Sequence, residues 1–304
     1  MSELILHQYA MSPFSEKIRT MLGYTGQSWK AVTVREMPPR PDLEPLADGY
    51  RKIPVAQIGA DVFCDTRTIS REIARMSGKP ELALENNSQE VQDFVREVDL
   101  QIFLACIVSS SGGGLLIKLI RNTSIIDAYK FLKDRIEMGK KSKVRSVSPK
   151  QAKARVAEHV ADLEKRLTRD FLFGDKPCIA DFSAYHGLWF VCDVAEKDVL
   201  KNAPRVSAWM ERIRAFGHGS VEEISGDQAL EVAHATLPRP LPSSNANGSI
   251  GQTVRVAPDD YGREPITGTL VADDGTSWII AHEHPRVGTV NIHVPQQGFS
   301  LKDR

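Results

Sequence analysis

Residues 52–66 read KIPVAQIGADVFCDT, and this stretch decides the fold of the first domain. Two short apolar runs, residues 55–58 and 62–64, flank a Gly59-Ala60 turn, which predicts a β-hairpin. Pro54 stands at the start of the first strand, where its missing N–H is tolerated. Asp65-Thr66 then supplies the N-terminal cap of a helix that runs to about residue 76.

The residues before this stretch predict a βαβ unit. Residues 4–8 (LILHQ) and 29–34 (WKAVTV) have the apolar character of buried strands. Between them, apolar residues recur at helical spacing, with Ser12 at the N-cap and Pro13 at the first helical position. We therefore expect an amphipathic helix of two to three turns. The proline-rich residues 37–49 are expected to be a long loop without a helix or a strand.

The rest of the chain divides into a helical part and a β part. Helical periodicity extends from residue 88 to about 216, is broken at Gly112-Gly113-Gly114 and restarts at Ser148-Pro149. After a Pro- and Ser-rich linker at 236–250, the sequence turns to short apolar runs separated by Gly, Asp and Pro, which predict a separate, barrel-like β module. The expected fold is an α/β thioredoxin-like domain, an all-α domain and a small all-β module. The predicted boundaries are 1–78, 88–235 and 250–304.

Composition excludes several classes of function. The 304 residues contain 39 basic and 39 acidic side chains, so neither nucleic acid nor an anionic membrane is expected as a partner. The one basic stretch, residues 140–145, is interpreted as a solvated helix end or loop. No C-x-x-C pair occurs among the cysteines, no apolar run reaches 18 residues, and residues 1–10 lack a signal-peptide pattern. We expect a soluble, cytoplasmic protein with reduced thiols.

Three features of the first domain predict one ligand site. If the Ile53–Pro54 bond is cis, the N–H and C=O of Ile53 face outward and can pair with an extended peptide. Asp65 and Thr66 at a helix N-terminus suit the ammonium and carboxylate of a ligand. Ser12, at the start of the first helix, favours a nearby thiolate. Each feature alone has an ordinary structural explanation, but the predicted topology brings all three to one edge.

These residues resemble the cytosolic glutathione transferases. Residues 12–19 (SPFSEKIR) resemble the serine-type motif, residues 52–55 (KIPV) the cis-proline strand, and Asp65-Thr66 the acidic residue and hydroxyl that hold the γ-glutamyl end. The resemblance implies that Ser12 bonds the thiolate of glutathione and that Ile53 and Pro54 hold its cysteinyl unit. It also implies that Phe14, within the motif, contacts glutathione.

The resemblance extends over roughly residues 3–220. Residues 177–181 (PCIAD) resemble the capping box of the family's helical domain, with Cys178 in place of the usual Ser or Thr. Asp181 is expected to bond back to the backbone of the cap. The β module has no counterpart in the ordinary architecture of the family.

Alternatives within the family remain at the thiol position. Thioltransferase members carry Cys where Ser12 stands, and serine cannot form a mixed disulfide. Zeta-type isomerases carry Cys where Phe14 stands. Tyr9 is the second choice after Ser12 as the partner of the thiolate.

Other side chains are candidates for lining or ligating residues. Phe14, Phe103 and Tyr129 are expected either to pack in the core or to line an apolar co-substrate pocket. His282-Glu283-His284, with His293, does not predict a metal site, because adjacent residues of a strand point to opposite faces.

Two functions follow from these expectations. The first is an enzyme that joins glutathione, as co-substrate and without a metal, to a small apolar electrophile. The alternative is a non-catalytic glutathione-binding scaffold whose β module recruits a partner. The family resemblance also implies a homodimer.

Overall fold

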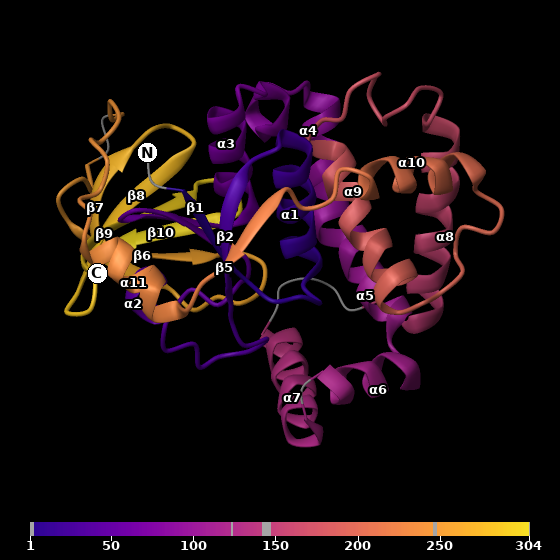
Figure 1. Ribbon diagram of the computed structural model, residues 1–304, viewed down its shortest axis with the longest axis horizontal. Coiled ribbons are helices and arrows are strands. Elements are labelled where there is room, and N and C mark those ends of the chain that lie inside the picture. The colour runs from indigo at the N-terminus through magenta and orange to yellow at the C-terminus, as the bar shows by residue number, and fades with distance from the viewer. Residues whose placement is uncertain (1–2, 123, 142–146, 246–247, 304) are drawn as a thin grey trace.

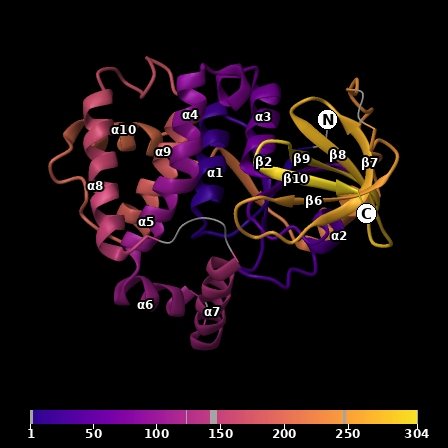
Figure 2. The same ribbon diagram turned by 180° about the vertical axis from the view of Figure 1, so that it is seen from behind.

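The computed structural model describes residues 3–122, 124–141, 147–245 and 248–303. The first domain lies in the middle of the molecule, with the helical region on one side and the C-terminal strands on the other (Figure 1). The same arrangement is visible from behind, where α6 and α7 extend away from the other helices (Figure 2). Most of the basic stretch at 140–145 lies outside the described residues.

The first domain contains the predicted βαβ unit and the hairpin. Its elements are β1 (Leu4–Gln8), α1 (Pro13–Thr25), β2 (Ser28–Thr33), α2 (Glu44–Ala47), β3 (Val55–Ile58), β4 (Asp61–Cys64) and α3 (Thr66–Ser77). The strands lie in the order β4-β3-β1-β2, with β2 parallel to β1 and β3 antiparallel to both of its neighbours. The two faces alternate along each strand: Leu4 and Leu6 pack toward α1 and α3, whereas Ile5 packs toward the opposite side.

The expectation that residues 37–49 contain no helix is wrong. Helix α2 occupies residues 44–47 and buries Leu46 and Ala47 against the sheet. Pro45 falls in the first turn of this helix, where the missing N–H has no helical partner to lose. The prolines therefore shorten the helix without preventing it.

The amphipathic interpretation of α1 is also wrong. Its polar residues Glu16, Lys17, Arg19 and Thr20 are between 1% and 6% exposed, as buried as its apolar residues. Helix α1 contacts α3 on one side and α9 of the helical region on the other. Because it is enclosed by two domains, residues 15–22 are buried on every side, and only Phe14 and the last turn are partly exposed.

The helical region follows the predicted pattern. After the 3₁₀ turns at Pro80–Leu82 and Leu84–Asn86, the helices are α4 (Gln89–Glu97), α5 (Phe103–Ser110), α6 (Gly113–Asn122), α7 (Ile125–Lys141), α8 (Pro149–Arg166), α9 (Ile179–Trp189) and α10 (Pro204–Arg214), with π-helical turns at Val98–Ile102 and Phe190–Val194. The helical pattern breaks near the triple glycine, as expected, but only Ser111 and Gly112 lie between α5 and α6, and Gly113 and Gly114 begin α6. Ser148 caps α8, as expected.

The predicted bond of Asp181 at the start of α9 is confirmed. Its carboxylate accepts from the backbone N–H of Cys178 at 2.9 Å. The same side chain also accepts from the N–H of Leu172 and from Trp209 Nε1, both at 2.9 Å. Asp181 thus joins the cap to the core of the helical region.

From residue 253 onward the C-terminal region has the predicted all-β character, but the region is not a separate module. It comprises β5 (Ser220–Glu223), α11 (Gly226–His234), β6 (Thr253–Pro258), β7 (Ile266–Asp273), β8 (Ser277–His284), β9 (Gly288–Pro295) and β10 (Phe299–Asp303). Within the described residues, ten strands form one sheet in the order β10-β6-β7-β8-β9-β4-β3-β1-β2-β5. Strand β9 pairs in parallel with β4, and β5 pairs in parallel with β2. Residues 218–303, here called the extension, therefore add strands to both edges of the first domain's sheet.

A shared core explains why the extension does not stand apart. Val55, Val62 and Cys64 of the first domain pack in one cluster with apolar residues of all five strands from β6 to β10 and with Leu230 of α11. The extension covers the sheet face opposite α1 and α3, where an open face would otherwise expose apolar side chains.

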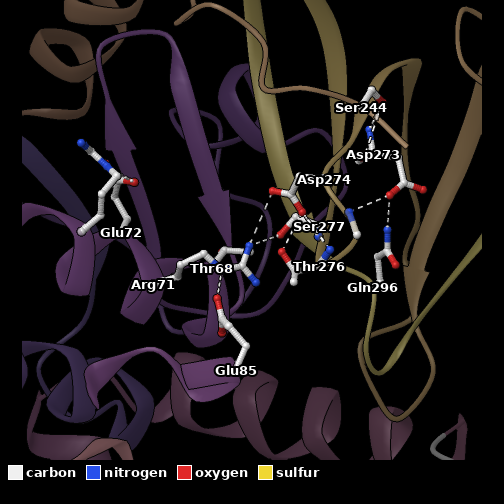
Figure 3. Close-up of polar contacts among 12 residues, drawn as sticks. Thr68, Arg71, Glu72, Glu85, Ser244, Asp273, Asp274, Thr276, Ser277 and Gln296 are labelled. Carbon is white, nitrogen blue, oxygen red and sulfur yellow. Dashed lines mark hydrogen bonds and ion pairs between the residues drawn. The ribbon is translucent and has the colours of Figure 1, made fainter. Parts of the chain in front are cut away.

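Two polar junctions fix the extension to the first domain. Asp61 of β4 is 1% exposed, and its carboxylate meets His293 Nε2 of β9 at 2.7 Å and the backbone N–H of Arg239 at 2.9 Å. Arg71 of α3 donates to Ser277 Oγ at 2.7 Å and also contacts Asp274 and Glu85 (Figure 3). The two junctions hold the start of β4 and helix α3 in a fixed relation to the extension.

All four cysteines carry free thiols, and Cys64, Cys106 and Cys178 are buried. Burial raises the pKa of the Cys106 thiol to about 12 and also raises that of Cys64. No helix in the described part of the chain is both long and apolar enough to cross a membrane.

Asp61→Asn is expected to lower the free energy of unfolding by about 2 kcal/mol at pH 7, because it removes a buried charge from its partners. Burial alone would raise the pKa of Asp61, but His293 and Arg239 lower it overall. The stabilisation is therefore present above the ordinary aspartate pKa of about 3.9 and is lost as pH falls through and below it. Urea unfolding of both proteins should show a smaller difference in the free energy of unfolding at pH 3 than at pH 7.

Asp175→Asn is the control for Asp61, because its side chain is 76% exposed and pairs with Arg169 at 3.7 Å. We expect a change below about 0.5 kcal/mol for it. An equal loss of unfolding free energy in Asp61→Asn and Asp175→Asn would contradict the stabilising role of the buried Asp61 carboxylate. A difference between Asp61→Asn and wild type that does not depend on pH would contradict it as well.

Candidate thiol-peptide site

The register of the sheet brings the three predicted segments together. His7 of β1 pairs with Val55, and Val55 pairs with Cys64 of β4. Pro54 directly precedes Val55, the first residue of β3. It therefore lies between the end of β1 and the start of α3. The Ile53–Pro54 bond is cis, as the resemblance to the family's cis-proline strand implied. The turn that carries Ser12, the Ile53–Pro54 segment and Asp65-Thr66 therefore lie at the same end of the sheet.

Ser12 is the N-cap of α1. Its Oγ accepts from the backbone N–H of Ser15 at 3.2 Å, and the residue is 2% exposed. Its own N–H donates to the carbonyl of Tyr9 at 3.1 Å, so both candidates for the thiolate partner belong to one turn. Pro13 has no N–H, and the N–H groups of Ser15 and Glu16 bond back to Ser12, which leaves the Phe14 N–H at the positive end of the helix dipole.

Arg19 holds the turn from behind. Its guanidinium donates to the carbonyls of Ala10 at 3.0 Å and Tyr9 at 3.4 Å, and to Gln8 Oε1 at 2.5 Å. Glu16 neutralises it at 2.7 Å. Since a guanidinium is planar and fixes several acceptors at once, Arg19 sets the path of the chain that leads into Ser12.

Asp65 starts α3 with an unusual backbone. Its φ of 78° is in the left-handed region that non-glycine residues rarely adopt. Its carboxylate accepts from the N–H of Arg67 at 3.0 Å, which caps the helix. Thr66 follows as the first helical residue and is 7% exposed. An outlier of this kind costs of order 1–3 kcal/mol and is typical of functional sites.

A buried ion cluster lies behind Phe14, two residues after Ser12. Lys17 Nζ is 2.8 Å from Asp99 Oδ2, and His186 Nε2 is 3.1 Å from Asp99 Oδ1. Burial would raise the pKa of Asp99, but Lys17 and His186 lower it well below its usual range. Burial lowers the pKa of His186, although Asp99 acts in the opposite sense. The cluster joins α1 to the helical region through a single carboxylate.

Of the three aromatic candidates, two come together. The rings of Phe14 and Phe103 are 4.6 Å apart, and Phe14 lies 4.5 Å from the His186 ring. Tyr129 on α7 is 68% exposed, so it is not a core residue. The Phe14–Phe103 pair places apolar surface next to the start of α1.

Sequence reasoning missed four residues of this site: Lys17, Arg19, Asp99 and His186. Their positions on helices look like those of ordinary solvated side chains. The available signal was the density of charge at residues 16–19, directly after a proposed ligand-binding serine. Only the packing of the helical region against α1 reveals that these charges are buried.

The histidines near the C-terminus have structural partners. His293 bonds Asp61, and the rings of His282 and His284 are 6.5 Å apart on the same face of β8. Among the residues that the structure describes, no three His, Cys, Asp or Glu side chains form a group that could hold a metal.

Family models agree with this architecture. One described as the glutathione S-transferase N-terminal domain matches residues 6–81, and one described as the glutathione S-transferase C-terminal domain matches residues 132–212. Curated proteins gave no match. The first model spans the segments around Ser12, Pro54 and Thr66.

Solved structures extend the likeness. A GST-like protein from Pseudomonas syringae is 32% identical, with a TM-score of 0.79 over 100% of both chains. The apo form of a glutathione S-transferase III is 18% identical, with a TM-score of 0.51 over 70% of this chain and 92% of that one, which is a likeness of fold. A thioredoxin-like domain joined to a helical domain is the architecture of glutathione transferases. This chain belongs to the glutathione S-transferase family, and the Pseudomonas syringae alignment includes its extension.

Arg19→Lys is expected to loosen the Ser12 turn, because an ammonium cannot hold the Tyr9 and Ala10 carbonyls as a planar fork does. The free energy of unfolding should fall by about 2 kcal/mol, and amides of residues 9–15 should exchange faster with deuterium. Arg75→Lys, on a side chain that is 56% exposed, is the control. Unchanged exchange in residues 9–15 would refute the positioning role.

Asp99→Asn should lower the free energy of unfolding by about 3 kcal/mol at pH 7, because it leaves the Lys17 ammonium buried without a carboxylate. Lys17→Met in the same background should recover part of the loss. Asp93→Asn, in an exposed pair with Arg96, is the matched control. Chemical denaturation measures all four proteins, and a double variant less stable than Asp99→Asn would argue against the ion-pair explanation.

Proposed function

We propose that this protein is a glutathione transferase that joins the glutathione thiolate to a small apolar electrophile. The observation that carries the proposal is the meeting of the Ser12 turn, the Ile53–Pro54 segment and Asp65-Thr66 at one end of the sheet. Membership of the family supplies the thiol peptide as the ligand class.

Each segment has a distinct role in this proposal. The Ile53 backbone pairs with the cysteinyl unit as an added strand would. Thr66 and the N–H groups of α3 receive the γ-glutamyl carboxylate, and Asp65 receives its ammonium. Ser12 Oγ donates to the sulfur, and the N-terminus of α1 stabilises the negative charge that forms. Phe14 lies next to the bound peptide.

The reaction requires no group beyond these. The thiolate attacks the electrophilic carbon, a carbon–sulfur bond forms, and the leaving group departs with the electron pair, or the electron pair moves onto the acceptor in an addition. The protein contributes a lowered thiol pKa and the positioning of two reactants. The Phe14–Phe103 pair gives an apolar electrophile a surface beside the sulfur.

Location and assembly are proposed from the family. We expect a cytoplasmic homodimer that serves in detoxification and binds neither nucleic acid nor membrane. The scaffold alternative drew its motivation from a free β module. Because β9 pairs with β4 and the two regions share a core, the extension has a structural role that requires no recruited partner.

Ser12→Ala should reduce kcat/KM for conjugation of an aryl halide by at least about tenfold, with a raised apparent pKa of the bound thiol in the pH–rate profile. Tyr9→Phe should have less than about a twofold effect. Ser88→Ala is the matched control, because Ser88 caps α4 through the N–H of Val91 at 3.4 Å, far from the site. It removes a helix cap worth about 1 kcal/mol without touching the thiol.

Unchanged activity in Ser12→Ala, Tyr9→Phe and the double variant would refute the catalytic assignment. Retention of wild type on immobilised glutathione without turnover on a broad electrophile panel would favour the scaffold.

A further inference from the structure

The extension borders the proposed glutathione site on both sides. Lys52 directly precedes Ile53–Pro54, and its ammonium is bound by Asp260 of the β6–β7 loop. Arg67 directly follows Asp65-Thr66, and its guanidinium donates to the carbonyl of Gln297 in the β9–β10 turn. These contacts place two loops of the extension against the residues that flank the predicted ligand contacts.

Lys52 is fully engaged by this contact. Its Nζ lies 2.7 Å and 3.0 Å from the two carboxylate oxygens of Asp260. The same ammonium is 4.4 Å from the centre of the Tyr261 ring and 5.7 Å from that of Phe299. Only 15% of the Lys52 side chain is exposed. An ion pair with two aromatic neighbours leaves this cation little attraction for a further anion.

Arg51, one residue earlier, is neutralised in the same way. Its guanidinium lies 2.9 Å from Glu264 of the extension and 2.5 Å from Asp134 of α7. Two consecutive cations beside the Ile53–Pro54 segment thus face three carboxylates, none of which comes from the first domain. Without these three carboxylates, both cations would lack the ion pairs that they form in the structure.

The position of Asp260 is set by the fold. Its Oδ1 accepts from the N–H of Tyr261 at 2.7 Å, and the N–H of Asp259 donates to the carbonyl of Gly298 at 2.9 Å. Arg71 holds the β7–β8 turn on α3, as Figure 3 shows. The loop that carries Asp260 is thus bonded to the β9–β10 turn, and its carboxylate lies beside Lys52.

We propose that Asp260 is a specificity determinant for the thiol co-substrate, because it occupies the Lys52 ammonium in place of a carboxylate of the ligand. Glutathione carries two carboxylates, so it loses an attraction on which its diester, a free thiol without carboxylates, does not depend. The site thereby binds glutathione less tightly and discriminates less between charged and esterified thiols. This inference rests on the proposed glutathione site.

The test compares binding of glutathione and of glutathione diethyl ester to the full chain by calorimetry under reducing conditions. Asp260→Asn should raise the affinity for glutathione about fivefold, because the Lys52 ammonium near the surface loses its carboxylate partner and can attract the ligand. The affinity for the diester should stay equal or fall. Lys52→Met in the Asp260→Asn background should abolish the gain. Asp259→Asn is the matched control, since its carboxylate pairs with none of the described cations; we expect less than about a twofold effect.

Glu264→Gln provides a second variant if Asp260→Asn is poorly folded, and it should raise glutathione affinity to a smaller extent through Arg51. Equal gains for glutathione and diester, or no gain for glutathione in either variant, would overturn the inference. If wild type and Asp260→Asn both fail to bind glutathione, the proposed function falls with it. If wild type binds glutathione and Ser12→Ala binds it more weakly, the proposed function stands. If neither Asp260→Asn nor Glu264→Gln then binds glutathione more tightly, only the inference is wrong.

Discussion

Helix α1 is enclosed between the sheet and the helical region, and this enclosure constrains the rest of the site. Its charged side chains cannot reach water, so each needs a partner inside the protein. Arg19 donates to the carbonyls that precede Ser12, and Lys17 forms an ion pair with Asp99 of the helical region. The same pairs that make burial tolerable also fix the turn where the thiol is expected to bind.

The extension also covers edges and a face of the sheet that would otherwise be exposed. A four-stranded sheet has two edges with unpaired backbone groups and one face without helices large enough to cover it. Strand β5 pairs with the β2 edge, β9 pairs with the β4 edge, and α11 lies with α2 against the open face. A strand pair and a shared core, not a flexible tether, therefore join the extension to the family fold.

This attachment brings the extension to the ligand site. Strand β4 leads directly into Asp65, so a partner strand on the β4 edge necessarily places its loops near the start of α3. The contacts of Asp260 with Lys52 and of Gln297 with Arg67 follow from that placement. A structural addition to the sheet has thus changed the charge beside the proposed glutathione site.

The sequence alone determined the local elements and the three segments of the site. The helix caps at Ser12 and Asp65 and the hairpin depend on residues close together in the chain, whose conformational preferences are local. The burial of Lys17 and Arg19, the pairing of β9 with β4 and the ion pair between Lys52 and Asp260 were decided only by the tertiary structure. Asp99 lies 82 residues from Lys17, and Asp260 lies 208 residues from Lys52. Arg19 has partners close in the chain, but it is buried because the distant helix α9 packs against α1. Neither helical periodicity nor a strand pattern specifies which distant surface will cover a given face or edge.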